Sequence, residues 1–426
     1  FFEEIENQRV EYNYIHRDKS TFKSGVAKAV HGWFRLTPSF GPDLVRIVLD
    51  DFSSDTNSVV LDPFAGASTT LIECQLLNTK SYGFEINPML HFAGRTALNW
   101  SLAPLKLRKM EKELLGTYDT YVRTFSKYAL EDLPCPVPPI HNVHRWWRED
   151  VLKDLLTLKH SILEVCTDYG DEYRDFCFLC FAGVLVPDLT NVTLGKLQLH
   201  FIDRSNDTIN VRGTFANQLS NMIDDFDAIN ELETTNYAKL FHTDSTQLAG
   251  ISIDEEIDIV MTSPPYPNRY SYVWNTRPFL YFFDFFTTPR EASALDLKTI
   301  GGTWGTATSV LSKGCVEPIN SVVERHVKPI TEQIRKNDNL MANYVMKYFN
   351  MLTEQIIRMD RLLSERAKAA YVVGNSEIKG VFVETDILLS KIFKDISCGY
   401  KATRINRFRK RNSGKNLFES IVFALK

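Results

Sequence analysis

The feature that most constrains this chain is a short apolar strand that leads through a turn of small residues into a helix. Residues 58–61 read SVVL, residues 62–68 read DPFAGAS, and residues 69–77 have the pattern of a helix. A second strand follows at Lys80–Phe84 and leads into Glu85. Two strands joined by one helix predict a βαβ unit, in which both strands lie parallel in one sheet. We therefore expect an α/β fold with a doubly wound, mostly parallel sheet.

Further strands of this sheet are expected later in the chain. Lys239–His242 and Ile257–Thr262 follow a long, mostly helical stretch, and Ala369–Val373 follows another predicted helix. Two strand patterns on either side of residues 412–415 (NSGK) predict a terminal β-hairpin. Residues 287–340 contain several glycines, and we expect them to form an irregular, variable loop region.

The composition fits a globular protein and excludes several other classes. The chain has 426 residues, of which 44% are hydrophobic and 24% charged, unlike collagen or disordered chains. Its apolar runs are shorter than the roughly 20 residues that span a bilayer, and its first residues lack the pattern of a signal peptide. Seven cysteines, a sparse and odd number, favour a reducing compartment, and a net charge of −4 disfavours nonspecific coating of nucleic acid.

Two acidic residues stand where the two strands of the βαβ unit end. Asp62 opens the turn of small residues, and Glu85 follows about 20 residues later, where a carboxylate can bind the two hydroxyls of a ribose. Asp62 would repel a phosphate but attract an ammonium, and the turn lacks the G-x-G-x-x-G pattern of pyrophosphate sites. S-adenosylmethionine carries both a ribose and an ammonium, so it fits this pair of carboxylates.

A second motif, Ser263-Pro264-Pro265-Tyr266, follows the strand that ends at Thr262. The two prolines fix an extended backbone and leave carbonyl groups outside any strand ladder. The Ser263 hydroxyl and the Pro264 carbonyl can each accept a hydrogen bond from an amino group, and Tyr266 offers a ring for stacking. Together these groups can hold a flat heterocycle by its exocyclic amine.

With both motifs in this order, the chain resembles the amino-methyltransferases of DNA, which methylate N4 of cytosine or N6 of adenine. The resemblance covers about half of the chain. It implies S-adenosylmethionine as the methyl donor and a seven-stranded, Rossmann-like methyltransferase sheet with a terminal hairpin. One departure from the family pattern is Ser68, which stands where a glycine is common in the cofactor loop.

The resemblance also implies roles for individual residues. The catalytic tetrapeptide corresponds to Ser263, Pro264, Pro265 and Tyr266. Phe64 is expected against the adenine ring of the cofactor, Glu85 at the ribose and Asp244 near the adenine. The full set of expected cofactor contacts is Asp62, Pro63, Phe64, Ala65, Gly66, Glu85, Ile86, Asp244, Ser245, Thr262 and, from the segment that precedes the loop, Phe40. The chemistry requires no metal, and we expect none.

Contacts to DNA are harder to assign. The basic residues Arg404, Arg407, Arg409 and Arg411 of the terminal hairpin are candidates for phosphate contact, with a solvated edge as the alternative. Asn268, Arg269, Tyr270 and Tyr272, just past the tetrapeptide, are candidates for the base pocket or the flanking backbone. Residues 144–148 (HRWWR) mix basic and aromatic side chains, but we expect the two tryptophans to anchor helices.

The resemblance implies direct methyl transfer to a base that has left the duplex stack. Hydrogen bonds to Ser263 and Pro264 would make the amine nitrogen more tetrahedral and aim its lone pair at the methyl group. Serine rather than aspartate at the first position favours cytosine N4, because the serine form is most often associated with cytosine in this family. Adenine N6 stays open as the alternative.

Other functions are weighed against this one. Methylation at C5 needs a nucleophilic cysteine, but Cys135 lies in a proline-rich linker and no acidic residue precedes Asn142. An RNA methyltransferase with a similar tetrapeptide usually carries an RNA-binding module, of which we see no sign. A non-catalytic nucleic-acid-binding subunit would not need intact acidic and tetrapeptide residues.

Three regions are expected along the chain. Residues 1–102 would hold an N-terminal segment and the cofactor-binding half of the methyltransferase domain, and residues 236–426 its catalytic half. Residues 103–235 would form a helical insertion that takes part in DNA recognition. The expected partners are duplex DNA with a flipped base and a cognate restriction endonuclease or other defence proteins. We expect a cytoplasmic, nucleoid-associated protein of a bacterium or archaeon, without membrane contact and of undetermined oligomeric state.

Overall fold

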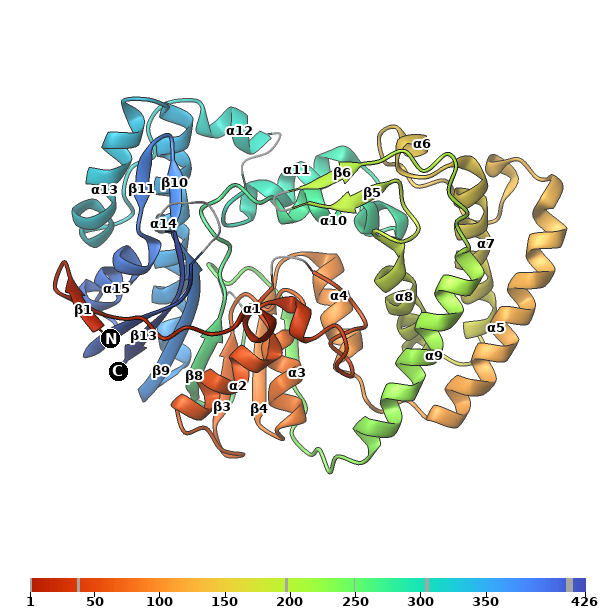
Figure 1. Cartoon of the computed structure of the whole chain (residues 1–426), viewed down its shortest axis with the longest axis horizontal. Helices are drawn as coiled ribbons and strands as arrows, with labels where there is room; N and C mark the ends of the chain where they lie inside the picture. The colour runs from red at the N-terminus through yellow and green to blue at the C-terminus, as the bar shows by residue number, and fades with distance from the viewer. Residues whose placement is uncertain (1, 37–38, 196–197, 249, 303–305, 411–416) are drawn as a thin grey trace.

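The two strands of the predicted βαβ unit lie within a nine-stranded sheet (Figure 1). The computed structural model describes residues 2–36, 39–195, 198–248, 250–302, 306–410 and 417–426, and within them the strand order is β1-β2-β12-β13-β9-β8-β3-β4-β7. The predicted unit corresponds to β3 (Val59–Asp62), α3 (Thr69–Leu76) and β4 (Lys80–Glu85). The expectation of an α/β fold with a large parallel sheet is confirmed.

The order of the parallel strands creates a switch point. β4 pairs in parallel with β3 and with β7 (Lys239–His242), β3 pairs with β8 (Ile257–Thr262), and β8 pairs with β9 (Leu363–Gly374). After β3 the chain moves outward through β4 and β7, and then returns to the other side of β3 for β8. Ligands of doubly wound sheets bind at the carboxyl ends of the strands where the order reverses, here between β3 and β8.

The expected count of seven strands is too low, because the N-terminal segment joins the sheet. β1 (Phe2–Ile5) and β2 (Gln8–Glu11) form a hairpin, and β2 pairs in parallel with β12 (Ala402–Lys410). β12 and β13 (Phe418–Leu425) form the predicted terminal hairpin, and β13 is antiparallel to β9. The N-terminal segment is polar, so its sequence does not indicate a buried strand. It joins the sheet through backbone hydrogen bonds between β2 and the otherwise open edge at β12.

Helices cover both faces of the sheet, because successive strand residues point to opposite sides. Val60 packs on one face with α2 (Pro42–Asp51) and α3, whereas Leu61 packs on the other face below α14 (Asn339–Met359) and α15 (Thr385–Asp395). The strands are therefore buried on both sides, which explains why they read as continuous apolar runs.

Residues 104–230 are mostly helical, as expected, and they lie at one end of the molecule (Figure 1). The long helices there are α5 (Pro104–Thr124), α7 (Glu149–Cys166), α8 (Asp171–Leu185) and α9 (Val211–Asn230). They share one hydrophobic cluster with Trp33, α3 and α4 (Pro88–Ala97). Trp146 and Trp147 are buried in that cluster, which confirms their expected anchoring role.

The expectation of an irregular region at residues 287–340 is wrong. This region contains α11 (Pro289–Lys298), α12 (Thr306–Leu311) and α13 (Ser321–Arg335). On α13, Val323, Val327 and Ile334 form a buried stripe at helical spacing, and Asn320 caps the first turn. Pro329 within the helix and the glycines before it obscured this pattern.

Shorter elements complete the fold. They are the helices α1 (Arg17–Ser20), α6 (Val143–Trp146) and α10 (Tyr272–Phe282), the hairpin of β5 (Val192–Leu194) and β6 (Leu199–Phe201), the hairpin of β10 (Ser376–Ile378) and β11 (Val381–Val383), and 3₁₀ turns at Phe22–Ser24, Phe125–Lys127, Leu130–Asp132 and Asp360–Leu362. Among the helices of the described ranges, none is both long and apolar enough to cross a bilayer.

Candidate active site

A pocket at the carboxyl ends of β3, β4, β7 and β8 brings most of the predicted site residues together. Its volume, open mouth included, is about 850 Å³, which suits a cofactor-sized ligand. The predicted residues that line it are Phe40, Pro63, Phe64, Ala65, Gly66, Glu85, Ile86, Asp244, Ser245, Ser263 and Pro265. The cofactor loop and the tetrapeptide, which are about 200 positions apart in the chain, thus face one cavity.

Asp62 and Thr262 lie behind the pocket lining rather than in it. Both are buried, and the Thr262 hydroxyl donates a hydrogen bond of 2.6 Å to Oδ1 of Asp62. The Phe64 amide donates to the same oxygen at 3.0 Å, which fixes the turn. Oδ2 of Asp62 is buried and has no hydrogen-bond partner within the described part of the chain. Burial raises the pKa of Asp62 to about 6, although the hydrogen bonds oppose this shift.

Glu85 connects the cofactor loop to the segment after β4. Its Oε2 accepts a hydrogen bond from the Gly66 amide at 2.9 Å, and its Oε1 accepts one from the Asn87 amide at 2.7 Å. Burial raises the pKa of Glu85 to about 7, and the nearby Asp62 adds to this shift. Two buried carboxylates close together favour a ligand that brings hydroxyl or ammonium donors.

Asp244 follows β7 and extends the same edge. Its Oδ1 accepts hydrogen bonds from the amide and the hydroxyl of Thr246, at 2.9 and 2.7 Å. The amide of Thr243 donates to the Glu85 carbonyl at 3.0 Å, so the loop after β7 is tied to the end of β4. Asp244 therefore reaches the pocket from a strand end next to that of Glu85.

Ser68 occupies a backbone conformation that explains why a glycine is common at this position in the family. It caps α3 with a φ of +63°, in the left-handed region. Its hydroxyl is buried and has no hydrogen-bond partner among the described residues. Gly94 on α4 makes room for it, because a Cβ there would collide with the Ser68 hydroxyl.

The segment before the cofactor loop is held against the helices. The His31 Nε2 lies 2.7 Å from Oε1 of the buried Glu73 on α3, and the Trp33 indole donates to Asp225 on α9 at 2.6 Å. Beyond these anchors, Leu36, Ser39 and Phe40 line the pocket, while residues 37–38 lie outside the described ranges.

The tetrapeptide is fixed against β9. The Ser263 hydroxyl donates a hydrogen bond of 3.2 Å to the Val372 carbonyl, which leaves its oxygen lone pairs available as acceptors. The Tyr266 ring packs over the end of the strand at Gly374, where a Cβ would lie only 2.7 Å from Cδ2 of the ring. Only glycine at position 374 permits this approach. Pro264 is buried, and neither it nor Tyr266 lines the pocket.

The residues just past the tetrapeptide point in different directions. Arg269 is exposed, and its amide donates to the Tyr344 hydroxyl at 3.1 Å, while Asn268 is half-buried. Tyr270, expected at the base pocket or on DNA, is instead buried, and its ring lies edge-on to Tyr272 with centroids 4.8 Å apart. Tyr272 is the member of this pair that lines the pocket.

Several pocket residues were missed as candidates. They are Leu36, Ser39, Asn87, Leu90, Thr243 and Lys298, and Thr299 and Ile300 also line the pocket. Tyr272, in contrast, was among the candidates for the base pocket, and it lines the pocket. Asn87 and Thr243 adjoin predicted residues and could have been found by extending the motifs. Lys298–Ile300 belong to no motif. They reach the pocket at the end of α11, which packs against α10 and α12 and is tied to the start of α10 by a hydrogen bond of 2.9 Å from Ser271 to Asp296. Residues 303–305, just past this stretch, lie outside the described ranges.

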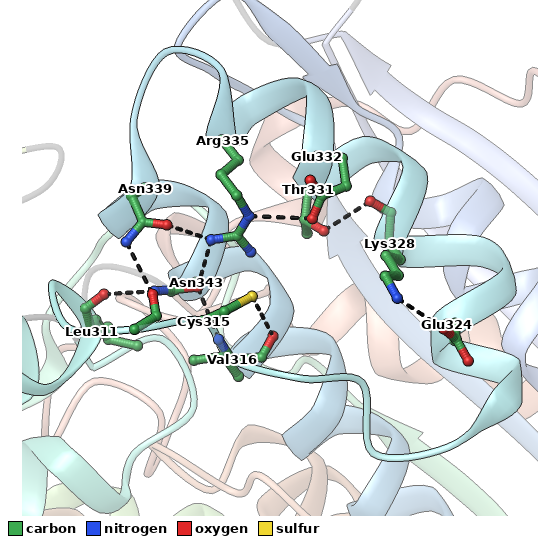
Figure 2. A network of polar contacts seen from close by, with 11 residues as sticks. Leu311, Cys315, Val316, Glu324, Lys328, Thr331, Glu332, Arg335, Asn339 and Asn343 are labelled. Carbon is green, nitrogen blue, oxygen red and sulfur yellow. Dashed lines mark hydrogen bonds and ion pairs between the residues drawn. The ribbon is translucent and has the colours of Figure 1, made fainter.

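Helix α14 holds the loops on this side of the pocket. Lys347 donates to the Leu297 carbonyl at 2.9 Å, just before the lining residues at 298–300. One turn away, Asn343 donates to the Leu311 carbonyl at 2.9 Å and accepts from the Val316 amide at 3.0 Å. Figure 2 shows Asn343 at the centre of this network, with Arg335 of α13 donating to the same side chain. These contacts fix the chain between the tetrapeptide and α13.

The hairpin arginines are not arranged for phosphate contact. Arg407 is buried, and its guanidinium donates to Asp386 at 2.9 Å and to Glu384 at 3.0 Å, so the expectation of a DNA contact there is wrong. Arg404 is paired with Asp51, and Arg409 is paired with Glu419. Arg411 lies outside the described residues. Cross-strand and helix contacts, which a local count of basic residues does not show, neutralise these charges.

Comparison with known proteins agrees with this geometry. A family model for N6/N4 methyltransferases, described as DNA methylase, matches residues 16–92, which include the cofactor loop and Glu85. The type II methyltransferase M.BsoBI of Geobacillus stearothermophilus is 22% identical, with 98% of this chain and 89% of that protein aligned. M.MvaI of Kocuria varians is 24% identical over 78% of this chain and 73% of its own length. M.AvaI of a Nostoc species is 20% identical over 95% of this chain and 86% of its own length.

A solved structure of an rRNA methyltransferase from Streptomyces viridochromogenes overlaps 97% of this chain and 96% of its own at a TM-score of 0.32 and 11% identity. This overlap is too weak to support a conclusion about fold or substrate. The family match, the full-length relatives and the motifs that face one pocket agree with one another. The chain is thus similar to DNA amino-methyltransferases of the N4/N6 family, through the family model at residues 16–92 and through relatives that align over most of its length.

Proposed function

We propose that this protein methylates the exocyclic amine of a flipped DNA base, with cytosine N4 as the target and S-adenosylmethionine as the donor. The observation that carries the proposal is the single pocket lined both by Glu85 of the cofactor side and by Ser263 of the tetrapeptide. In a doubly wound sheet, two substrates can meet at the strand ends around the switch point. Much of the rate enhancement would come from this alignment.

The residues of the pocket fit the cofactor. Glu85 retains lone pairs for the hydroxyls of a ribose. Just behind the lining, Oδ2 of Asp62 has no hydrogen-bond partner among the described residues and is the proposed acceptor for the ammonium group. Asp244, Ser245, Ile86 and Phe64 would hold the adenine, while Pro63, Ala65, Gly66 and Phe40 complete the lining. Thr262 would act through Asp62, which it holds in place. When bound, the cofactor supplies an electrophilic methyl group.

The tetrapeptide would hold the target amine. Ser263 already donates its proton to Val372, so its hydroxyl oxygen is oriented to accept a hydrogen bond from the base. The Pro264 carbonyl is proposed as the second acceptor, with Pro265 lining the pocket beside it. Both groups would stabilise the positive charge that develops on nitrogen as the new bond forms. Tyr266 would stack on the base, and Asn268 and Arg269 would grip the flanking strand.

The preference for cytosine N4 rests on Ser263. An uncharged acceptor at this position is the form most often associated with cytosine in the family, whereas an aspartate is associated with adenine. A base can reach an enclosed pocket only after it leaves the stack, so we propose that duplex DNA is bound with the target flipped.

We further propose a division of labour along the chain. Residues 1–102 and 236–426 would together form the methyltransferase domain, since β3 and β4 pair with β7 and β8 in one sheet. Residues 103–235 would form the inserted region that contacts DNA. The names of the relatives, type II methyltransferases, support a cognate restriction endonuclease as a functional partner. The bacterial sources of those relatives support a cytoplasmic site of action at the nucleoid.

The proposal is tested by incubating the protein with S-adenosylmethionine and mixed-sequence duplex DNA, followed by digestion and mass spectrometry of the nucleosides. N4-methylcytosine is the expected product. N6-methyladenine would overturn the assignment of the base and preserve the proposed pocket. Methylation of RNA alone, or of neither substrate, would overturn the proposed function.

The role of Tyr266 has its own test. Tyr266→Ala should lose most turnover while the protein still gains thermal stability from the cofactor. Gly374→Ala should act in the same direction, because its methyl group would displace the Tyr266 ring. Tyr237→Ala, at an exposed tyrosine that does not line the pocket, is the matched control and should turn over normally. Equal turnover in all three variants would show that Tyr266 has no role in the reaction.

A further inference from the structure

Two arginines lie on a ladder of aromatic rings beside the active-site pocket. The Arg277 guanidinium carbon on α10 lies 4.3 Å from the ring centroid of Trp274 and 6.0 Å from that of Trp146. The Trp146 ring meets Phe201 of β6 at 4.8 Å, and the Arg145 guanidinium carbon lies 3.9 Å from the Phe201 centroid. We call this set the arginine ladder. It joins α6, the β5–β6 hairpin and α10, which lie near one another in Figure 1.

Within the described ranges, the two arginines of the ladder have no carboxylate partner. Whereas Arg404, Arg407 and Arg409 each have a carboxylate partner, the described residues provide none to Arg145 or Arg277. Arg277 is half-buried, and this burial lowers its pKa. A desolvated cation without a counter-ion is unfavourable, and it suits an anion supplied by a ligand.

The ladder lies next to the active-site pocket. α10 begins at Tyr272, which lines the active-site pocket, and Arg277 follows less than two turns later. A smaller adjacent pocket is lined by Arg35, Leu199, Asn275 and Thr276, and it shares Leu36 with the active-site pocket. Arg35 is exposed there and also has no carboxylate partner among the described residues.

The chemistry of the ladder fits a phosphate. An aromatic face holds the guanidinium plane in one orientation, and the planar fork of donors matches two phosphate oxygens. The Trp146 ring is only 3% exposed, so it supports Arg277 and is not free to stack on a base. We propose that Arg145 and Arg277 bind backbone phosphates of the DNA strand that flanks the flipped base. This inference rests on the proposed function and names the surface that holds its substrate.

The test compares variants that each remove one positive charge. Arg145→Gln, Arg277→Gln and their double variant are compared with Arg212→Gln, whose guanidinium is already tied to Asp119 at 2.6 and 2.8 Å. Binding to a short mixed-sequence duplex is measured over a series of salt concentrations in the presence of S-adenosylhomocysteine. The slope of log K against log salt should become shallower by about 0.9 for each ladder arginine and by about 1.8 for the double variant. Arg212→Gln should leave the slope unchanged.

Arg277→Lys keeps the charge and should keep the slope, even where the loss of the planar fork weakens binding. Thermal stabilisation by S-adenosylhomocysteine checks that each variant retains a folded pocket. If the ladder variants show the same slope of log K against log salt concentration as the wild type, the inference is overturned while the proposed function stands. The inference is also overturned if the variants lose affinity for some base sequences only and the loss does not depend on salt. That result would mean that the arginines contact bases. A wild type that binds no duplex overturns both proposals.

Discussion

Asp62 and Glu85 are single residues whose burial sets the chemistry of the pocket. Desolvation raises their pKa values to about 6 and about 7, so near neutral pH each carboxylate is close to its titration point. In the unfolded chain both groups ionise at lower pH. Their contribution therefore lowers the stability of the unliganded protein as the pH rises from about 4.5 to about 7. A ligand that donates hydrogen bonds to the ionised forms reverses this effect, so cofactor binding is linked to deprotonation.

The first prediction is that the cofactor binds more tightly as the pH rises. If Glu85 must be ionised, with a pKa of about 7, the affinity should increase about tenfold between pH 6 and pH 7.5. This range lies below the usual pKa of an α-amino group, so more than half of the ligand's amino groups remain protonated throughout it. Isothermal titration calorimetry with S-adenosylhomocysteine measures the effect.

Glu85→Gln is the control for this prediction. It should weaken binding by roughly 1.5–3 kcal/mol, the contribution of a charge-assisted hydrogen bond, and remove most of the pH dependence. If the affinity of the Glu85→Gln variant depends on pH as that of the wild type does, then a group other than Glu85 causes the pH dependence.

The second prediction concerns Ser68, which combines a left-handed backbone with a buried hydroxyl that has no partner among the described residues. Ser68→Gly should raise the free energy of unfolding by about 1 kcal/mol, because it removes both penalties at the cost of added freedom in the unfolded chain. Urea unfolding measures the change. Ser53→Gly is the matched control, with a φ of +55° on an exposed turn, and it should give a smaller gain. A gain at position 53 as large as that at position 68 would contradict a role for the buried hydroxyl.

At the scale of the element, the β12–β13 hairpin is held by charge pairs that run to neighbouring elements. Arg407 of β12 pairs with Asp386 of α15, which is fully buried and also accepts a hydrogen bond from Ser420 of β13 at 2.8 Å. Although burial opposes it, the nearby carboxylates raise the pKa of Arg407. The hairpin thus uses its basic residues for cohesion between strand and helix.

The third prediction is that Arg407→Ala destabilises the fold by about 3–5 kcal/mol, because it leaves Asp386 buried without its cation. Thermal or urea unfolding measures the loss. Arg409→Ala removes a more exposed pair with Glu419 and should cost about 1 kcal/mol or less. A loss at position 407 no greater than that at position 409 would contradict a structural role for the buried pair.

At the scale of the whole molecule, the helical region is continuous with the sheet domain. One hydrophobic cluster contains Trp33, Leu71 of α3 and Met89 of α4 together with Leu155 of α7 and Phe215 of α9. Since these side chains share one core, neither part can lose its packing without exposing the other.

The fourth prediction follows from this shared core: the protein should unfold in one cooperative transition. Differential scanning calorimetry should give a calorimetric enthalpy equal to the van't Hoff enthalpy. S-adenosylhomocysteine should raise the midpoint temperature of the whole transition by mass action, although its proposed site lies in the sheet domain. Two resolved transitions, of which only one responds to the ligand, would contradict this prediction.

The sequence alone determined the parts of the molecule that depend on local signals. Apolar runs between turns predicted the strands β3, β4 and β8. Because the carboxyl ends of parallel strands lie at one edge of a sheet, the sequence also predicted that Glu85 and Ser263 lie at the same edge. These inferences worked because strand direction and the motif at each strand end are properties of short segments.

Only the tertiary structure decided which side chains are free to act. Arg407 and Arg277 look alike in the sequence, yet one is neutralised by Asp386 from a distant helix and the other lies on tryptophan rings without a carboxylate among the described residues. Tyr270 is buried while Tyr272 faces the pocket, because the start of α10 orients them differently. Burial and pairing arise from contacts between residues far apart in the chain, which local patterns do not encode.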